Sequence, residues 1–203
     1  MEKAAKLYAD ALNGPEGKAA RAYLKNRGFD AELCARLGIG YAPGGWQNLA
    51  TVFSDFQAKA LVQAGLVIEG EGKRYDRFRD RIMFPIINQK GAVIGFGGRV
   101  LETGEPKYLN SPESPVFKKG ETLFGLSQAK EAVSKEGFVL VVEGYFDLVA
   151  LHRHGFLNCV ATMGTALTTD HIRTLKGYTS SIYALFDSDE AGKKAALRGL
   201  NLF

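Results

Sequence analysis

The chain has 203 residues, and its 46% hydrophobic content supports a buried core in one large domain or two modest ones. Its 26 basic and 22 acidic side chains leave a formal charge of +4, and no apolar run is long enough to span a membrane. The two cysteines, Cys34 and Cys159, lie far apart and outside any CxxC pattern, so the sequence indicates neither a disulfide framework nor a structural zinc site. The amino-terminal residues MEKAAKLYAD lack the apolar stretch of a secretory signal, so we expect a cytoplasmic protein with no membrane association.

Residues 1–65 have the pattern of a mostly helical segment. Pro15 is typical of the first turn of a helix, and Gly28 follows that helix as a stop signal. Asp30 predicts the N-cap of a second helix, and Ser54 predicts the N-cap of a third. The stretch YAPGGW, between the second and third helices, predicts a loop.

The pattern changes toward strands after Leu66. RIMFPII and AVIGFGGRV are β-rich runs, and NQKG between them suits a hairpin connection. Residues 102–122 hold three of the six prolines and have almost no periodicity, so we expect a long loop there. A further helix is predicted from Ser127 to about Lys135.

The last part of the chain alternates between buried strands and helices. Continuous apolar strands in such an order predict a parallel sheet that is covered on both faces. We therefore expect an α/β protein with a mixed α+β amino-terminal subdomain over residues 1–126 and a parallel-sheet subdomain over residues 127–203. The expected strands cover 138–142, 158–163 and 181–186, and the expected helices cover 146–154, 169–175 and 190–200.

Carboxylates follow two of these strands at the point where each strand ends. Glu143 comes after FVLVV, and Asp187 and Asp189 come after SIYALF. Ligands of an open parallel sheet bind beyond the carboxyl ends of its strands, so neighbouring strands would bring these side chains to one edge. Carboxylate oxygens select Mg²⁺ or Mn²⁺. The alternative is that Glu143 is an ordinary loop residue and that DSD is a solvated helix cap.

A row of arginines precedes the RIMFPII strand. Arg77, Arg79 and Arg81 alternate in sequence, so an extended chain would aim them to one side. Such a row suits a nucleic-acid backbone or a triphosphate. The neighbouring Asp76 and Asp80 leave open the alternative of a salt-bridged face.

A second basic segment lies further along the chain. Arg99, Lys107 and Lys119 supply positive charge, and Tyr108 supplies a stacking surface. This combination is used to bind single-stranded nucleic acid, although each of these residues taken singly is typical of a solvated surface.

Several motifs together resemble those of a known family. VVEGYFDLVAL, ATMGTALTTDH and ALFDSDEAGKKAA are similar to the Toprim metal-binding module. YDRFRDRIMFPI, VIGFGGRV and KYLNSPESPVFKKGETLFG resemble the catalytic core of bacterial DNA primase of the DnaG type. The resemblance runs through most of the chain, and it implies an enzyme that makes RNA primers on single-stranded DNA.

The resemblance also implies a role for each matching residue. Glu143, Asp187 and Asp189 match the catalytic metal ligands, and Asp147 matches an accessory acidic residue of the same site. Magnesium or manganese is the implied cofactor, without zinc. The residues implied to hold nucleotide or template are Arg27, Arg99, Lys107, Tyr108 and Lys119.

The implied partners are a single-stranded DNA template and ribonucleoside triphosphates. A replicative helicase and a single-strand-binding protein would act through regions absent from this chain, which we expect to be a monomer. The sequence ends inside an amphipathic helical pattern, so we expect a fragment whose Toprim-like subdomain is truncated, whose metal site is incomplete and which is inactive alone. A Toprim nuclease or topoisomerase and a non-catalytic nucleic-acid-binding fragment are the alternative functions.

Overall fold

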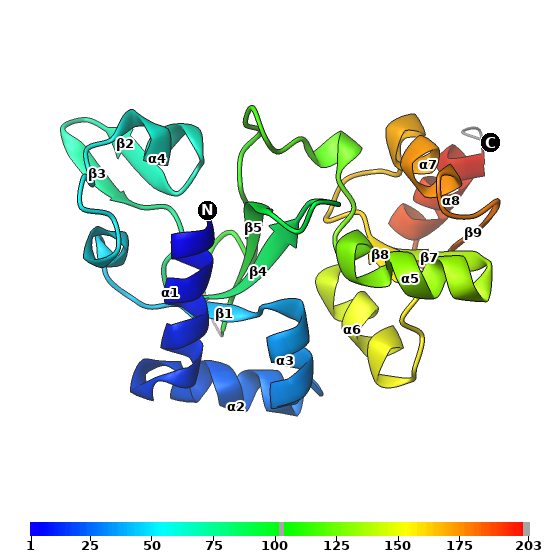
Figure 1. The fold of residues 1–203 in the computed structure, drawn as a ribbon, viewed down its shortest axis with the longest axis horizontal. Helices are drawn as coiled ribbons and strands as arrows, with labels where there is room; N and C mark the ends of the chain where they lie inside the picture. The colour runs from blue at the N-terminus through cyan, green and yellow to red at the C-terminus, as the bar shows by residue number, and fades with distance from the viewer. Residues whose placement is uncertain (102–103, 201–203) are drawn as a thin grey trace. The chain divides into compact units, whose positions relative to one another are not determined.

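The computed structural model describes residues 1–101 and 104–200, except for the side chains of Ala191 and Leu200. The chain forms two compact units (Figure 1). Unit 1 comprises Met1–Ile86 and Ala92–Phe117, and unit 2 comprises Ile87–Gly91 and the chain from Lys118 onward. The domain boundary expected between residues 126 and 127 stays a prediction.

Unit 1 combines short helices with antiparallel strands, as expected for its mixed α+β pattern. Its helical elements are α1 (Glu2–Asn13), η1 (Pro15–Gly17), α2 (Lys18–Asn26), α3 (Ala31–Leu37), η2 (Asn48–Thr51) and α4 (Lys59–Gln63). Its strands are β1 (Gly40–Ala42), β2 (Val67–Gly70), β3 (Lys73–Asp76), β4 (Arg81–Ile87), β5 (Val93–Val100) and β6 (Tyr108–Asn110).

A four-stranded sheet of order β1-β4-β5-β6 organises unit 1, and helix α1 lies beside β1 (Figure 1). Tyr8 of α1 contacts Phe96 of β5 edge to face, with ring centroids 5.3 Å apart. The approach of α1 requires a glycine in β1, because a Cβ on Gly40 would lie only 2.6 Å from the Cβ of Tyr8. The predicted strands RIMFPII and AVIGFGGRV are confirmed as β4 and β5.

The helix starts of unit 1 were predicted with mixed success. Asp30 caps α3 as expected, because its carboxylate accepts a hydrogen bond of 2.7 Å from the amide of Leu33. The helix expected from Ser54 is wrong: α4 begins only at Lys59, and Ala58 is its N-cap.

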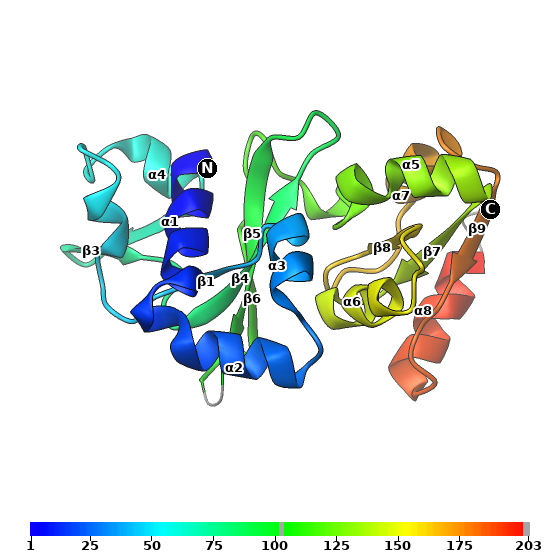
Figure 2. The same cartoon turned by 60° about the horizontal axis from the view of Figure 1, so that its bottom comes forward.

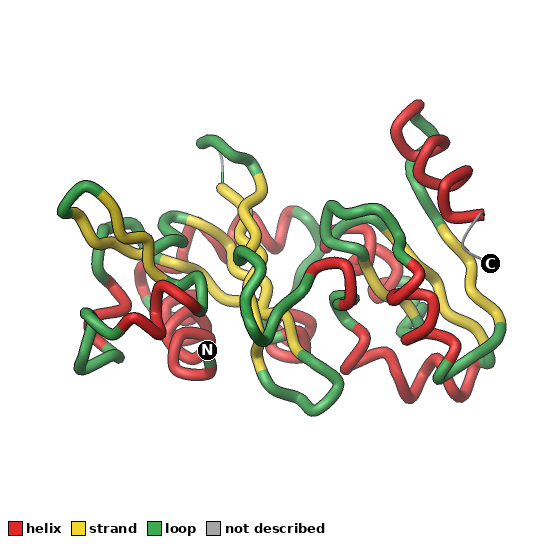
Figure 3. The backbone as a smooth tube through the Cα atoms, turned by 90° about the horizontal axis from the view of Figure 1, so that it is seen from above, coloured by secondary structure: helices red, strands yellow, loops and turns green. Residues whose placement is uncertain are grey.

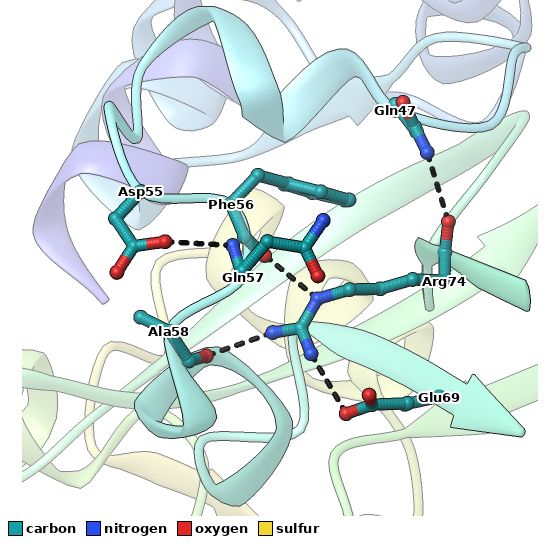
Figure 4. Close-up of polar contacts among 7 residues, drawn as sticks. All are labelled: Gln47, Asp55, Phe56, Gln57, Ala58, Glu69 and Arg74. Carbon is teal, nitrogen blue, oxygen red and sulfur yellow. Dashed lines mark hydrogen bonds and ion pairs between the residues drawn. The ribbon is translucent and has the colours of Figure 1, made fainter. Parts of the chain in front are cut away.

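Arg74 of β3 explains why the chain after Ser54 is not helical. Its guanidinium donates to the backbone carbonyls of Phe56 and Ala58 at 2.7 and 2.8 Å, and it pairs with Glu69 at 2.7 Å (Figure 4). The carbonyl of Phe56 is therefore bonded to the β2–β3 hairpin. The carbonyl of Ala58 is shared between Arg74 and the amide of Leu61, in the first turn of α4. The local capping signal is overridden by this tertiary contact.

Unit 2 follows the predicted order of alternating helices and strands. Its elements are η3 (Lys119–Glu121), α5 (Leu126–Glu136), β7 (Phe138–Val142), α6 (Tyr145–Arg153), β8 (Cys159–Ala161), α7 (Thr169–Lys176), β9 (Ser181–Ala184) and α8 (Glu190–Leu200).

The three strands form a parallel sheet of order β8-β7-β9, which confirms the expected sheet type. Helices α5 and α7 pack on one face of β7 and β8, and α6 lies on the other (Figure 2). At β9 the expected coverage of both faces is wrong, since Tyr183 is 55% exposed. The reason is that α6 packs against β8 and leaves that face of the edge strand open.

Neither unit contains a membrane-spanning element within the described ranges. None of their helices is long and apolar enough to cross a bilayer.

Candidate metal edge and basic surfaces

Glu143 and Asp187 lie together at the carboxyl edge of the unit 2 sheet. Glu143 directly follows β7. The neighbouring β9 runs into a loop that leads to the last helix (Figure 3), and Asp187 lies in the loop between β9 and α8. The amide of Leu185 still bonds to the carbonyl of Val141 at 2.8 Å, which keeps the two chain segments side by side. One Glu143 carboxylate oxygen accepts a bond of 3.4 Å from the amide of Asp187. The expected adjacency of the two strands is therefore confirmed.

Asp147 adds a third carboxylate to this edge. It lies in the first turn of α6, where its side chain accepts a bond of 2.9 Å from the amide of Gly144. Burial raises the pKa of Asp147, the bond from Gly144 opposes the rise, and the negative charge of Asp187 adds to it. The charge of Asp187 thus acts directly on Asp147.

Asp189 has a different local partner. Its carboxylate accepts a bond of 2.8 Å from the amide of Gly192, so it caps the start of α8. Gly192 must be a glycine, because a Cβ there would lie 2.7 Å from the carbonyl carbon of Asp187. Among the residues that the structure describes, no group of three or more His, Cys, Asp or Glu side chains is arranged to hold a metal ion.

A cavity of about 240 Å³ opens beside Glu143. We call it the Glu143 pocket. Its wall includes residues of the loop after β8, between Thr162 and Leu167, as expected for MGTALT. It also includes Arg198 of α8, a residue that the sequence patterns did not select. The available signal was its spacing, because Arg198 lies one helical turn after Ala195, which lines the same pocket.

By residue type, the donors at this edge are those that a hard divalent cation prefers. Glu143, Asp147 and Asp187 offer carboxylate oxygens only, which suit Mg²⁺ or Mn²⁺ better than zinc. Burial is the main cause of the raised pKa of Asp147, and the negative charge of Asp187 adds to it. A cation at this edge would offset both effects.

In unit 1, four residues form what we call the Arg99 cluster: Tyr23, Arg27, Arg99 and Tyr108. The Arg99 guanidinium lies over both tyrosine rings, 5.0 Å from the centroid of Tyr23 and 5.4 Å from that of Tyr108. It donates to both phenolic oxygens, at 3.1 Å for Tyr108. The guanidinium of Arg27 also lies over the ring of Tyr23, 5.2 Å from its centroid. The structure therefore unites three predicted residues through Tyr23, which was not predicted.

A second aromatic and basic group in unit 1, which we call the Trp46 stack, consists of Trp46, Tyr75 and Arg79. The rings of Trp46 and Tyr75 meet edge to face at 5.4 Å. The Arg79 guanidinium lies 4.6 Å from the Trp46 centroid and 4.9 Å from that of Tyr75, and it also donates to the carbonyl of Asp76. Trp46 is 64% exposed, so the stack presents an aromatic surface to solvent.

The expected row of Arg77, Arg79 and Arg81 on one side of an extended chain is wrong. Strand β3 ends at Asp76, and Asp80 has a φ of 51° before β4 begins. This turn sends the three side chains to different surroundings.

Arg79 joins the Trp46 stack, and Arg77 is half-buried. Arg81 is only 6% exposed. Burial lowers the pKa of both Arg77 and Arg81. The binding roles of all three residues stay predictions.

The two predicted lysines lie in different units. Lys107 is exposed in unit 1, where its carbonyl accepts from the amide of Val100 at 3.2 Å. Lys119 opens η3 in unit 2, the unit that also carries Glu143 and Asp187. It therefore does not belong to the surface of unit 1, with which it was grouped.

Comparison with known families agrees with this architecture. Residues 137–203 match the Toprim domain, so the parallel-sheet unit belongs to the Toprim class of modules. Residues 7–130 match the DNA primase catalytic core, N-terminal domain. The chain belongs to the family of DNA primase catalytic cores, and as a family these Toprim enzymes depend on a divalent metal.

Individual relatives of the chain are also DNA primases. The chain is 55% identical to the DNA primase of Neisseria meningitidis serogroup A over 182 residues, which cover 90% of this chain and 31% of the relative. It thus spans about a third of that relative's length.

Two solved structures are also similar. The E. coli primase catalytic core matches with a TM-score of 0.94 and 43% identity, over 100% of this chain and 66% of the other. A structure of the DnaG primase catalytic domain bound to ssDNA matches with a TM-score of 0.93 and 43% identity, over 100% and 64%. The fold class and the family expected from the sequence are confirmed.

Proposed function

We propose that the chain is part of an enzyme that synthesises RNA primers on a single-stranded DNA template. The single observation that carries the proposal is the meeting of Glu143 with Asp187 at the carboxyl edge of the parallel sheet, in a chain of the primase core family. Mg²⁺ or Mn²⁺ would be held by Glu143, Asp187 and Asp189, with Asp147 as their acidic neighbour.

The reaction is nucleotidyl transfer. The 3′-hydroxyl oxygen of the primer bonds to the α-phosphorus of a ribonucleoside triphosphate, pyrophosphate leaves, and the hydroxyl proton passes to solvent. When held by Glu143, Asp187 and Asp189, a divalent cation would supply Lewis-acid activation of the hydroxyl and would neutralise charge on the leaving group.

The chain's own residues would prepare the acidic edge. The amide of Asp187 holds one oxygen of Glu143, and the amide of Gly144 holds one oxygen of Asp147, so both carboxylates are oriented before a cation binds. The Glu143 pocket beside them combines this charge with Arg198, which suits the phosphates of a triphosphate.

Unit 1 would bind the template and the nucleotide. The Trp46 stack offers an exposed ring for unpaired bases, and the Arg99 cluster offers oriented cations and tyrosines. Lys107 of unit 1 and Lys119 of unit 2 would add positive charge for phosphate groups. A helicase and a single-strand-binding protein are proposed as partners of the full-length protein, which we propose acts as a monomer in the cytoplasm.

The test is product analysis with the full-length protein, single-stranded DNA, ribonucleoside triphosphates and Mg²⁺. We expect oligoribonucleotides that disappear in Glu143→Gln. Nicked or relaxed DNA without RNA products would instead identify a Toprim nuclease or topoisomerase. DNA binding without either product would identify a non-catalytic binding protein.

A further inference from the structure

His171 is a fully buried histidine that bridges two segments of unit 2. It lies in the first turn of α7, and its side chain has no exposed surface. Its Nε2 atom is 2.9 Å from the carbonyl oxygen of Lys119 and 3.1 Å from that of Thr122. The ring therefore contacts both ends of η3, the turn that carries Lys119.

The neighbours of the ring define its protonation state. Both partners of Nε2 are carbonyl oxygens, which only accept, so Nε2 must carry the proton. Nδ1 lies 3.3 Å from the amide nitrogen of Thr168, which donates, so Nδ1 is the unprotonated acceptor. His171 is thus the neutral imidazole with its proton on Nε2. Burial, which lowers the pKa of His171, acts in the same direction.

Thr168 completes the attachment of the turn. Its hydroxyl oxygen accepts from the amide of His171 at 3.1 Å and donates to the carbonyl of Gly120 at 2.6 Å. The amino-terminal turn of α7 therefore binds the carbonyls of Lys119, Gly120 and Thr122.

The turn also has bonds of its own. The amide of Glu121 donates to the carbonyl of Lys118 at 3.1 Å, and the amide of Thr122 donates to the carbonyl of Lys119 at a longer 3.4 Å. Its ion pair between Lys118 and Glu121 is solvent-exposed, and exposed pairs of this kind contribute little. The bonds from α7 add to these and attach the backbone of Lys119, Gly120 and Thr122 to the start of that helix.

The segment to which the turn is attached is continuous with the wall of the Glu143 pocket. Thr168 follows Leu167, the last residue of the loop that lines that pocket. The backbone of Lys119 is therefore fixed to the same segment that forms the pocket wall.

We propose that His171 is a positioning residue for Lys119: its Nε2–H fixes the turn against the loop of the Glu143 pocket and so directs the Lys119 ammonium to a phosphate group of the substrate. The inference rests on the proposed phosphate-binding role of Lys119. The phosphate belongs to the incoming triphosphate or to the template strand. An effect on KM for the triphosphate indicates the first, and an effect on Kd for the template indicates the second.

Two substitutions distinguish the two nitrogens of the ring. The amide nitrogen of Gln reaches about as far as Nε2, so His171→Gln keeps a donor for the turn. The shorter Asn can accept from Thr168 but cannot reach the turn, so His171→Asn loses that donor. Each variant is made in the full-length protein, with and without Lys119→Ala.

The readouts are KM for ribonucleoside triphosphates at saturating template and Kd for a labelled oligo(dT). We expect His171→Asn to raise the constant that Lys119→Ala raises, by up to about tenfold, and His171→Gln to change it by less than about twofold. In the Lys119→Ala background, His171→Asn should have no further effect, because it acts only through Lys119.

Other outcomes overturn the inference in distinguishable ways. Independent, multiplying effects of His171→Asn and Lys119→Ala would show a merely structural histidine. If Lys119→Ala changes neither constant, the proposed role of Lys119 fails and the inference fails with it. Should thermal unfolding show that His171→Asn does not fold, the same cycle is run with Thr168→Val, which removes the bond to Gly120.

Discussion

Asp76 is a buried carboxylate that holds together the parts of the Trp46 stack. Its side chain accepts from the amide of Leu49 at 3.0 Å, and its own amide donates to the carbonyl of Trp46 at 2.7 Å. Its carbonyl accepts from Arg79. One residue thus connects the loop of Trp46 with the segment of Arg79.

The burial of Asp76 makes stability depend on pH. Burial raises its pKa to about 6, from the ordinary value of 3.8, although bonds from Leu49 and Asn48 and the charge of Arg79 oppose the rise. The folded state therefore binds this proton more tightly than the unfolded state does. The stability that the proton contributes is complete below about pH 3.8 and is lost as pH rises through about 6.

We predict that Asp76→Asn removes this component of the pH dependence. Asn is neutral and still offers an oxygen to the amide of Leu49. The unfolding free energy of the variant, relative to that of the wild-type protein, should therefore increase between pH 4 and 7, as Asp76 ionises in the wild-type protein. The largest increase expected is about 1.4 kcal/mol for each pH unit by which the pKa of Asp76 differs between the folded and unfolded states. Urea unfolding of both proteins across this range is the measurement, and parallel stability curves would contradict the prediction.

Trp46 is the only tryptophan of the chain, so its fluorescence reports on the stack alone. If bases stack on the ring, oligo(dT) should quench the fluorescence, and Trp46→Ala should weaken DNA binding by about 1–3 kcal/mol. Tyr183→Ala in unit 2 removes another exposed ring and is the matched control, expected to leave Kd unchanged. Unquenched fluorescence with intact DNA binding would remove Trp46 from the interface.

Single residues were the hardest feature to predict from sequence. The alternation of Arg77, Arg79 and Arg81 is real, but the turn at Asp80 depends on a distant partner, since Tyr41 donates to its carboxylate at 2.6 Å. No local pattern contains that contact. The meeting of Glu143 with Asp187 could be predicted in part, because the carboxyl ends of parallel strands lie at one edge of their sheet. The order β8-β7-β9, which places β7 beside β9, does not follow from the order of the strands in the chain.

At the level of elements, burial decided what could be predicted. Strand β7 is a short continuous apolar run rich in valine and packed between helices, and its length and composition favour a buried strand. The hairpin of β2 and β3 was missed because its strands are short and only partly buried, with Lys73 and Arg74 in the second. Strand β6 has three residues and exists because it pairs with β5, so its own sequence carries little signal.

The glycines of α8 allow a test of how this element holds the acidic edge. Gly192→Ala should displace the backbone of Asp187, because the new Cβ would lie 2.9 Å from its amide nitrogen. We expect primer synthesis by the full-length protein to fall by up to about a hundredfold, as displaced catalytic groups often cause. Gel analysis of labelled RNA products is the measurement.

Gly199→Ala is the control on the same helix. Its Cβ would meet the side chain of Leu167 at an ordinary 3.9 Å, so it should be accommodated and stabilise the helix by up to about 1 kcal/mol. Normal synthesis by Gly192→Ala would show that α8 does not fix the position of Asp187.

At the scale of the whole molecule, the acidic residues proposed for catalysis and the aromatic and basic residues proposed for template binding lie in different units. The paired carboxylates Glu143 and Asp187 lie in unit 2, whereas the Trp46 stack and the Arg99 cluster lie in unit 1. Catalysis and template binding should therefore be separable by single substitutions, even though one enzyme needs both.

Glu143→Gln and Arg79→Ala test this separation in the full-length protein. Glu143→Gln keeps an oxygen for the amide of Asp187 but removes the charge, so synthesis should be lost while Kd for oligo(dT) and its salt dependence stay unchanged. Arg79→Ala should weaken DNA binding and reduce the slope of log K against log salt by about one, because one phosphate contact is removed. Anisotropy titrations at several salt concentrations measure both. If Glu143→Gln weakens DNA binding as strongly as Arg79→Ala does, the acidic edge takes part in template binding and the division of roles between the units is wrong.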